Sequence, residues 1–159
     1  MRISFEVDDT LILHDTPGPR EVVVPWYWRW FYPEPLRHGT KALMHALQQR
    51  GCEICLYTTS YRQPRYLRSW FKTFGVQLGE IINQDVHDQR VKKAQFPDYM
   101  PSKFPPAFGI DLHVDDSEGV ALEGDQHGFR VVVVPASDLG WAERVLAAVD
   151  ELNAATGSR

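Results

Sequence analysis

The sequence predicts a three-layer α/β sandwich around a mostly parallel, Rossmann-like sheet. Strand-like segments alternate with helix-like segments along the chain, which is the order of a sheet covered by helices. The later strands are apolar on both faces, as strands of buried parallel sheets are. Three strand ends carry acids or hydroxyls, and open α/β sheets bind their ligands beyond the carboxyl ends of the strands.

Short apolar segments predict the strands. In residues 2–7, Ile3, Phe5 and Val7 share one face, while residues 130–134 are a continuous apolar run. The expected strands are residues 2–7, Glu53–Tyr57 and residues 80–83, 112–114 and 130–134.

Helical spacing predicts the elements between these strands. Leu43, Met44 and Leu47 recur at helical intervals before Gly51, which can end a helix. Pro64 can open the next helix, and Gly75 can close it. The expected helices are residues 40–50, 64–74, 118–126 and 141–153, and residues 85–106 stay unassigned.

The segment between the first strand and the first helix predicts a β-hairpin flap. Its arms are residues 11–14 and 21–24, and residues 15–19 supply the turn. A loop over residues 25–35 follows, crowded with aromatic side chains: Trp26, Tyr27, Trp28, Trp30, Phe31 and Tyr32. A loop cannot easily bury all six, so this aromatic segment is expected to form a lid, a self-association contact or a partner surface.

Length and composition bound the remaining possibilities. The 159 residues suit one domain over residues 1–159, without room for a separate cap domain. No apolar run is long enough for a membrane span, and the amino terminus lacks the features of a leader, so we expect a cytoplasmic protein without membrane contact. A net charge of −4 argues against nucleic-acid binding. Cys52 and Cys55 are expected to be buried free thiols rather than a redox pair, because the pair begins a strand and not a helix.

The strand ends predict a magnesium site beside a phosphate site. Carboxylates brought together at neighbouring strand ends repel one another unless a cation neutralises them, and hard oxygen ligands suit Mg²⁺. Hydroxyl groups and a lysine suit the oxygens of a phosphate. The residues concerned are Glu6, Asp8, Asp9, Thr58, Thr59, Lys103, Asp115 and Asp116.

In these motifs the chain resembles the haloacid dehalogenase (HAD) superfamily. That family has an apolar strand followed by Asp-x-Asp-x-Thr, a second strand ending in Ser or Thr, a lysine, and a fourth motif with paired acids after an apolar strand. Here the four motifs are Phe5-Glu6-Val7-Asp8-Asp9-Thr10, Leu56-Tyr57-Thr58-Thr59, Lys103 and Leu112-His113-Val114-Asp115-Asp116. The resemblance extends from about residue 2 to residue 135.

The resemblance implies a role for each matching position. The first acid of the first motif attacks phosphorus and binds Mg²⁺, and the second protonates the leaving group and offers its carbonyl to the metal. These positions are Glu6 and Asp8. Asp115 completes the metal site with the support of Asp116, while Thr58 and Lys103 hold the phosphoryl oxygens. We add Asp9, Thr59 and Arg62 as expected substrate-binding residues.

Position 6 departs from the family pattern, because it is Glu where the family has Asp. The additional methylene lengthens the side chain by about 1.5 Å, and a misplacement of about 1 Å can cost on the order of a hundredfold in rate. Magnesium binding tolerates either carboxylate. A shifted register, with Asp8 attacking and Thr10 in the place of the second acid, would need a hydroxyl at position 12, which is Ile12.

Two function classes remain open. The first is a Mg²⁺-dependent phosphohydrolase acting on a phosphorylated small molecule or phosphoprotein, with activity weakened or altered by Glu6. The second is a catalytically inactive protein that binds a phosphorylated ligand or a protein partner. His14, in the predicted hairpin, is a candidate to contact a substrate, whereas His113 is expected to be a packed histidine that points away from the acids.

Overall fold

The computed structural model describes residues 1–15, 17–92, 95–96 and 99–157. Its centre is a sheet of five parallel strands in the order β5-β4-β1-β6-β7. The strands are β1 (Arg2–Phe5), β4 (Glu53–Tyr57), β5 (Leu78–Ile82), β6 (Leu112–Asp115) and β7 (Val131–Val133). This α/β architecture confirms the fold class predicted from the sequence.

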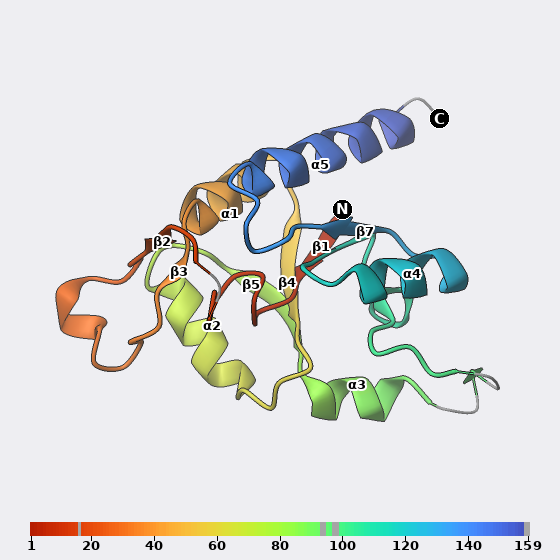
Figure 1. Cartoon of the computed structure of the whole chain (residues 1–159), viewed down its shortest axis with the longest axis horizontal. Coiled ribbons are helices and arrows are strands. Elements are labelled where there is room, and N and C mark those ends of the chain that lie inside the picture. Colours follow the sequence, from red (N-terminus) through yellow and green to blue (C-terminus); the bar gives the residue numbers. More distant parts are fainter. Residues whose placement is uncertain (16, 93–94, 97–98, 158–159) are drawn as a thin grey trace.

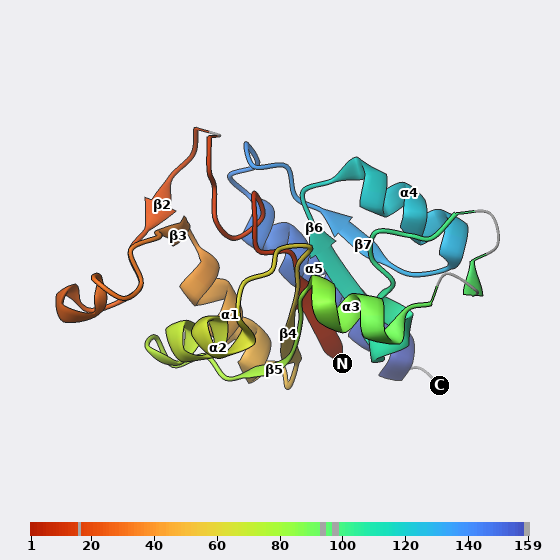
Figure 2. The same ribbon diagram turned by 90° about the horizontal axis from the view of Figure 1, so that it is seen from below.

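Helices cover both faces of the sheet, as Figures 1 and 2 show. The helices α1 (Thr40–Gln49) and α5 (Trp141–Gly157) contact each other over one face. The helix α2 (Pro64–Lys72) packs against β5 and shares the apolar cluster of α1 and α5. On the opposite face lie α3 (Gln84–Arg90) and α4 (Glu118–His127). Within the described ranges, the chain also forms the 3₁₀ turns η1 (Trp26–Trp28) and η3 (Pro105–Phe108).

Two apolar clusters hold these layers together. The larger joins side chains of β1, such as Ile3 and Phe5, to α1, α2 and α5. The smaller gathers Tyr57, Ile82 and Phe108 on the other face. Because successive residues of a strand alternate between faces, Ser4 lies on the opposite face from Ile3 and Phe5.

The prediction that residues 11–14 and 21–24 pair as a hairpin is wrong. The antiparallel pair joins β2 (Arg20–Glu21) to β3 (Leu36–Arg37). Residues 11–14 form no strand: the chain turns after Val7, whose carbonyl accepts from the amides of Leu11 and Ile12. Residues 11, 12 and 13 are all buried, so they lack the alternation of a hairpin arm. Residue 16 of the expected turn lies outside the described residues.

The unassigned stretch after β5 contains helix α3. Its N-cap is Asn83, whose side-chain oxygen accepts from the amide of Val86 at 3.1 Å. The strand before it begins two residues earlier than predicted and contains a register shift against β4. The other predicted helices and strands are present with small differences at their ends.

The aromatic segment extends from one end of the molecule, where the orange part of the chain lies in Figures 1 and 2. Tyr32 anchors it, because its ring stacks on Trp70 and its hydroxyl donates to Ser69 at 2.8 Å. Trp30 is 90% exposed, and four neighbours are also exposed: Trp26, Tyr27, Trp28 and Phe31. Part of the aromatic segment is therefore core, and its tip is an exposed apolar surface.

Cys52 and Cys55 are buried free thiols, as predicted. Burial raises the pKa of both thiols. Among the helices of the described ranges, none is both long and apolar enough to cross a lipid bilayer.

Candidate functional site

A cavity of about 280 Å³ lies at the carboxyl ends of β1, β4 and β6. These strands are neighbours in the sheet, so the residues that follow them meet at one edge. The cavity is lined by Glu6, Asp8, Asp9, Thr59, Ser102, Lys103, Asp115, Asp116, Ser117 and Val120. Most predicted site residues thus come together; Thr58 and Arg62 are absent from this lining.

Lys103 occupies the centre of the carboxylate cluster. It is 3% exposed, and its ammonium donates to Glu6 Oε2 and, at 2.5 Å, to Asp115 Oδ2. Burial alone would lower the pKa of Lys103, but the charges of Glu6 and Asp115 outweigh it and raise that pKa. Lys103 is therefore a fixed cation between two buried acids.

Glu6 is held at both carboxylate oxygens. Oε1 accepts from the backbone amides of Val7 at 2.8 Å and Asp8 at 3.3 Å, and Oε2 accepts from Lys103. The side chain thus turns back to its own backbone at Oε1 and faces Lys103 at Oε2. Neither oxygen is left without a donor, which reduces the nucleophilic character of this carboxylate.

His113 orients Asp115, contrary to the expectation that it points away from the acids. Its Nε2 lies 3.0 Å from Asp115 Oδ2, and its Nδ1 lies 2.7 Å from the hydroxyl of Ser4. Burial lowers the pKa of His113, so the neutral ring donates to Asp115 and accepts from Ser4. Burial would raise the pKa of Asp115, but the hydrogen bond from His113 and the charge of Lys103 hold it below its ordinary value.

Asp8 is held by Arg62 and His14, which both lie outside the cavity lining. Arg62 Nη1 contacts its oxygens at 2.5 and 2.6 Å, and His14 Nε2 lies 2.7 Å from Oδ1. The same guanidinium reaches Glu34 at 3.2 Å. Burial would raise the pKa of Asp8, but Arg62 and His14 lower it below its ordinary value. The expected general acid is therefore kept as an anion, and Arg62 is bound to protein rather than free for a ligand.

The remaining predicted residues have local partners. The hydroxyl of Thr58 is buried and bonded to Ser60, with both the hydroxyl and the amide of Ser60 at 3.1 Å. Asp9 has a positive φ of 57°, and its carboxylate accepts from the amide of His14 at 3.4 Å. Asp116 accepts from Thr10 at 2.9 Å, and burial together with the neighbouring charge of Asp115 raises its pKa.

The donor set fits Mg²⁺ in kind, because every candidate ligand is a carboxylate or carbonyl oxygen. Their side chains, however, are already paired with cations of the protein. Lys103 lies between Glu6 and Asp115, and Arg62 binds Asp8. Within the described ranges, no three His, Cys, Asp or Glu side chains are placed to share one metal ion. A bound ion would therefore require these carboxylates to turn away from their present partners.

The sequence predicts most of the cavity lining but not the residues behind it. No sequence pattern assigns a role to Ser4 or Glu34, and the predicted orientation of His113 is wrong. The alternation of side chains along a strand gives the position of His113, because residues 113 and 115 face the same side. No sequence signal pairs Arg62 with Glu34.

No family model matches the sequence, and no curated protein matches it. Two solved structures have a similar backbone path. A chain of the Pnkp1/Rnl/Hen1 complex is 16% identical over 86% of this chain, with a TM-score of 0.49; this protein spans 46% of that chain. A predicted HAD-like family hydrolase from Porphyromonas gingivalis is 10% identical, with a TM-score of 0.47 and coverage of 95% of this chain and 96% of that one. Identities this low say nothing about substrate or activity.

Proposed function

We propose that the cavity binds the phosphoryl group of a phosphate ester together with Mg²⁺, as a phosphohydrolase-type site with weak turnover. The observation that carries the proposal is the buried Lys103 within a cluster of acids at the strand ends. Five carboxylates and one ammonium line this cavity among the described residues. The net negative charge of this lining repels an anion such as phosphate unless a divalent cation binds with it.

Glu6, Asp115 and the carbonyl of Asp8 are the groups that would hold Mg²⁺, with Asp116 beside them. The ion would supply positive charge against the phosphoryl oxygens. In the reaction, a carboxylate oxygen of Glu6 forms a bond to phosphorus as the ester oxygen departs. Asp8 gives that oxygen a proton, and water then hydrolyses the acyl phosphate.

Two contacts predict that turnover is slow. Whichever oxygen of Glu6 attacks must first leave its donors, which are the amides of Val7 and Asp8 for Oε1 and Lys103 for Oε2. Asp8 must take up a proton although Arg62 and His14 hold its pKa low. A ligand phosphate that attracts Arg62 would weaken this hold on Asp8.

The same contacts favour a second candidate, a protein that binds a phosphorylated small molecule or phosphoprotein without hydrolysing it. An anionic Asp8 cannot donate a proton, and the bridge of Arg62 to Asp8 and Glu34 keeps Asp8 in that anionic state. The exposed aromatic segment would then offer a contact surface to the protein that carries the phosphate.

Hydrolysis of an aryl phosphate, measured with Mg²⁺ and with a chelator, tests the proposal. The hydrolase proposal predicts slow turnover that requires Mg²⁺ and is lost in Asp115→Asn but kept in Asp85→Asn, an exposed control. Absence of turnover with Mg²⁺-dependent binding of inorganic phosphate would support the second candidate. Absence of both turnover and binding would refute both.

A further inference from the structure

The two edges of the central sheet differ in how they meet solvent. At β5, Arg68 of α2 donates to the carbonyls of Leu78 and Gly79, the second at 2.8 Å, and the strand carries a register shift. Both features hinder the addition of another strand to an edge. The opposite edge, β7, is open.

The register of β7 shows which of its peptide groups are free. The amide of His113 donates to the carbonyl of Arg130, and the amide of Val134 donates to the carbonyl of Asp115. Alternate residues of a parallel strand bond to the neighbouring strand, so the peptide groups of Val131 and Val133 face outward. In the part of the chain that the structure describes, these outward groups have no hydrogen-bond partner.

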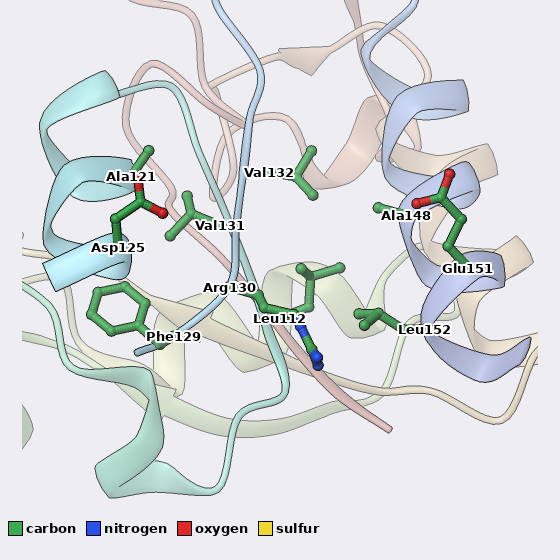
Figure 3. Close-up of a pocket in the computed structure, with 10 residues that line it drawn as sticks. All are labelled: Leu112, Ala121, Asp125, Phe129, Arg130, Val131, Val132, Ala148, Glu151 and Leu152. Atoms are coloured by element: carbon green, nitrogen blue, oxygen red, sulfur yellow. The ribbon is translucent and has the colours of Figure 1, made fainter. Parts of the chain in front are cut away.

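A groove of about 430 Å³ runs along this edge between α4 and α5. Figure 3 shows Val131 turned toward Ala121 and Asp125 of α4, and Val132 toward Ala148 of α5. The valines of β7 are only partly buried, in contrast to the interior residues of β1 and β6. An added strand about 4.8 Å away would place alternate side chains on the two sides of this groove.

The charges of the groove specify its occupant. Asp125 and Glu151 are exposed on its two sides, Arg130 is exposed where β7 begins, and these three make no ion pair within the described ranges. The groove therefore suits an extended apolar segment that begins with a cation. The sequence from Arg130 to Val134 is itself such a segment.

We propose that two copies of this chain pair antiparallel through β7 and so join their sheets. The Val131 residues of the two copies exchange both peptide hydrogen bonds, which places Arg130 of each copy opposite Val132 of the other. Arg130 and Val132 share the face covered by α5, and a two-fold axis perpendicular to the sheet keeps α5 of both copies on that face. Arg130 of each copy then meets Glu151 of the other.

Sedimentation velocity over a range of protein concentrations tests this pairing. The wild type should dimerise. Arg130→Glu and Glu151→Arg should each raise the dimer dissociation constant about tenfold or more, and the double variant should restore it. Glu143→Arg makes the same charge change on α5 outside the groove and should have no effect. Val131→Pro removes an outward donor and should give a monomer.

Three results would overturn the proposal: a wild type that is monomeric at every concentration, a charge-swapped pair that fails to restore the dimer, or a Glu143→Arg effect equal to that of Glu151→Arg. The charge swap decides the matter even if Val131→Pro fails to fold. Changing Trp28 and Trp30 to Ser should leave this dimer intact, and dissociation by that change alone would assign the contact to the aromatic segment instead.

Discussion

Replacing Lys103 by Met tests the charge at the centre of the cavity. Methionine keeps most of the length of the buried stem but carries no charge. The carboxylates of Glu6 and Asp115, both buried, would lose the ammonium between them. Removing one partner of a buried ion pair costs about 3–5 kcal/mol, because an uncompensated charge remains. We expect the free energy of unfolding at pH 7 to fall by about that amount.

The pH dependence separates this charge effect from a packing defect. In the wild type, the pKa of Asp115 is lowered. Its contribution to the free energy of unfolding is therefore complete above the unfolded pKa of about 3.9. This contribution is lost as the pH falls through the lower folded pKa. Lys103 has a raised pKa, so its contribution is present below about pH 10.4 and lost as the pH rises through the folded value. Without Lys103, the buried Asp115 should bind a proton more readily, and acidification from pH 7 to pH 5 should stabilise the variant relative to wild type.

Urea unfolding followed by tryptophan fluorescence at both pH values provides the measurement. Lys72→Met is the matched control, because Lys72 is exposed at the end of α2. The reasoning is refuted if Lys103→Met is as stable at pH 7 as Lys72→Met. It is also refuted if acidification to pH 5 destabilises Lys103→Met as much as wild type.

Three further predictions concern the metal, the ion pair and the aromatic segment. Asp115→Asn should weaken Mg²⁺ binding at least tenfold in titration calorimetry, a loss of about 1.4 kcal/mol, and equal affinity in both proteins would contradict the metal assignment. Arg62→Met should raise the pKa of Asp8, measured by carboxyl ¹³C NMR, because a cation that holds this group as an anion is lost; an unchanged pKa would mean that Arg62 does not set it. Changing Trp28 and Trp30 to Ser should leave the melting temperature nearly unchanged, since both rings are exposed, and should reduce in sedimentation any assembly larger than a dimer. A large loss of stability without a change in mass would show that both rings belong to the core.

The sequence was sufficient for features that depend on local periodicity. The apolar alternation of β1 and the paired acids at the end of β6 predict that Glu6 and Asp115 lie at one edge of the sheet, where the cavity is. The order of strands and helices predicted the parallel sheet, because a helix between two strands leads the chain back to the same edge.

Features that depend on pairing across the chain were not accessible in the same way. The partner of β2 is β3, and no local pattern favours residues 36–37 over residues 11–14 for that role. The contact between Arg62 and Asp8 joins residues 54 positions apart through a long flexible side chain. By contrast, the cap at Asn83 was readable from residue type, and α3 could have been predicted from it.

The most direct test of the proposed phosphohydrolase site is the turnover of Glu6→Asp on an aryl phosphate in the presence of Mg²⁺. Shortening the side chain by one methylene should draw the carboxylate back from Lys103 and free one of its oxygens for attack on phosphorus. We expect turnover to rise about tenfold or more over wild type, which corresponds to about 1.4 kcal/mol of barrier. Glu6→Gln, which keeps the length and removes the charge, should be inactive. A Glu6→Asp protein that binds Mg²⁺ as wild type does and yet hydrolyses nothing would contradict the hydrolase proposal and leave the ligand-binding function in its place.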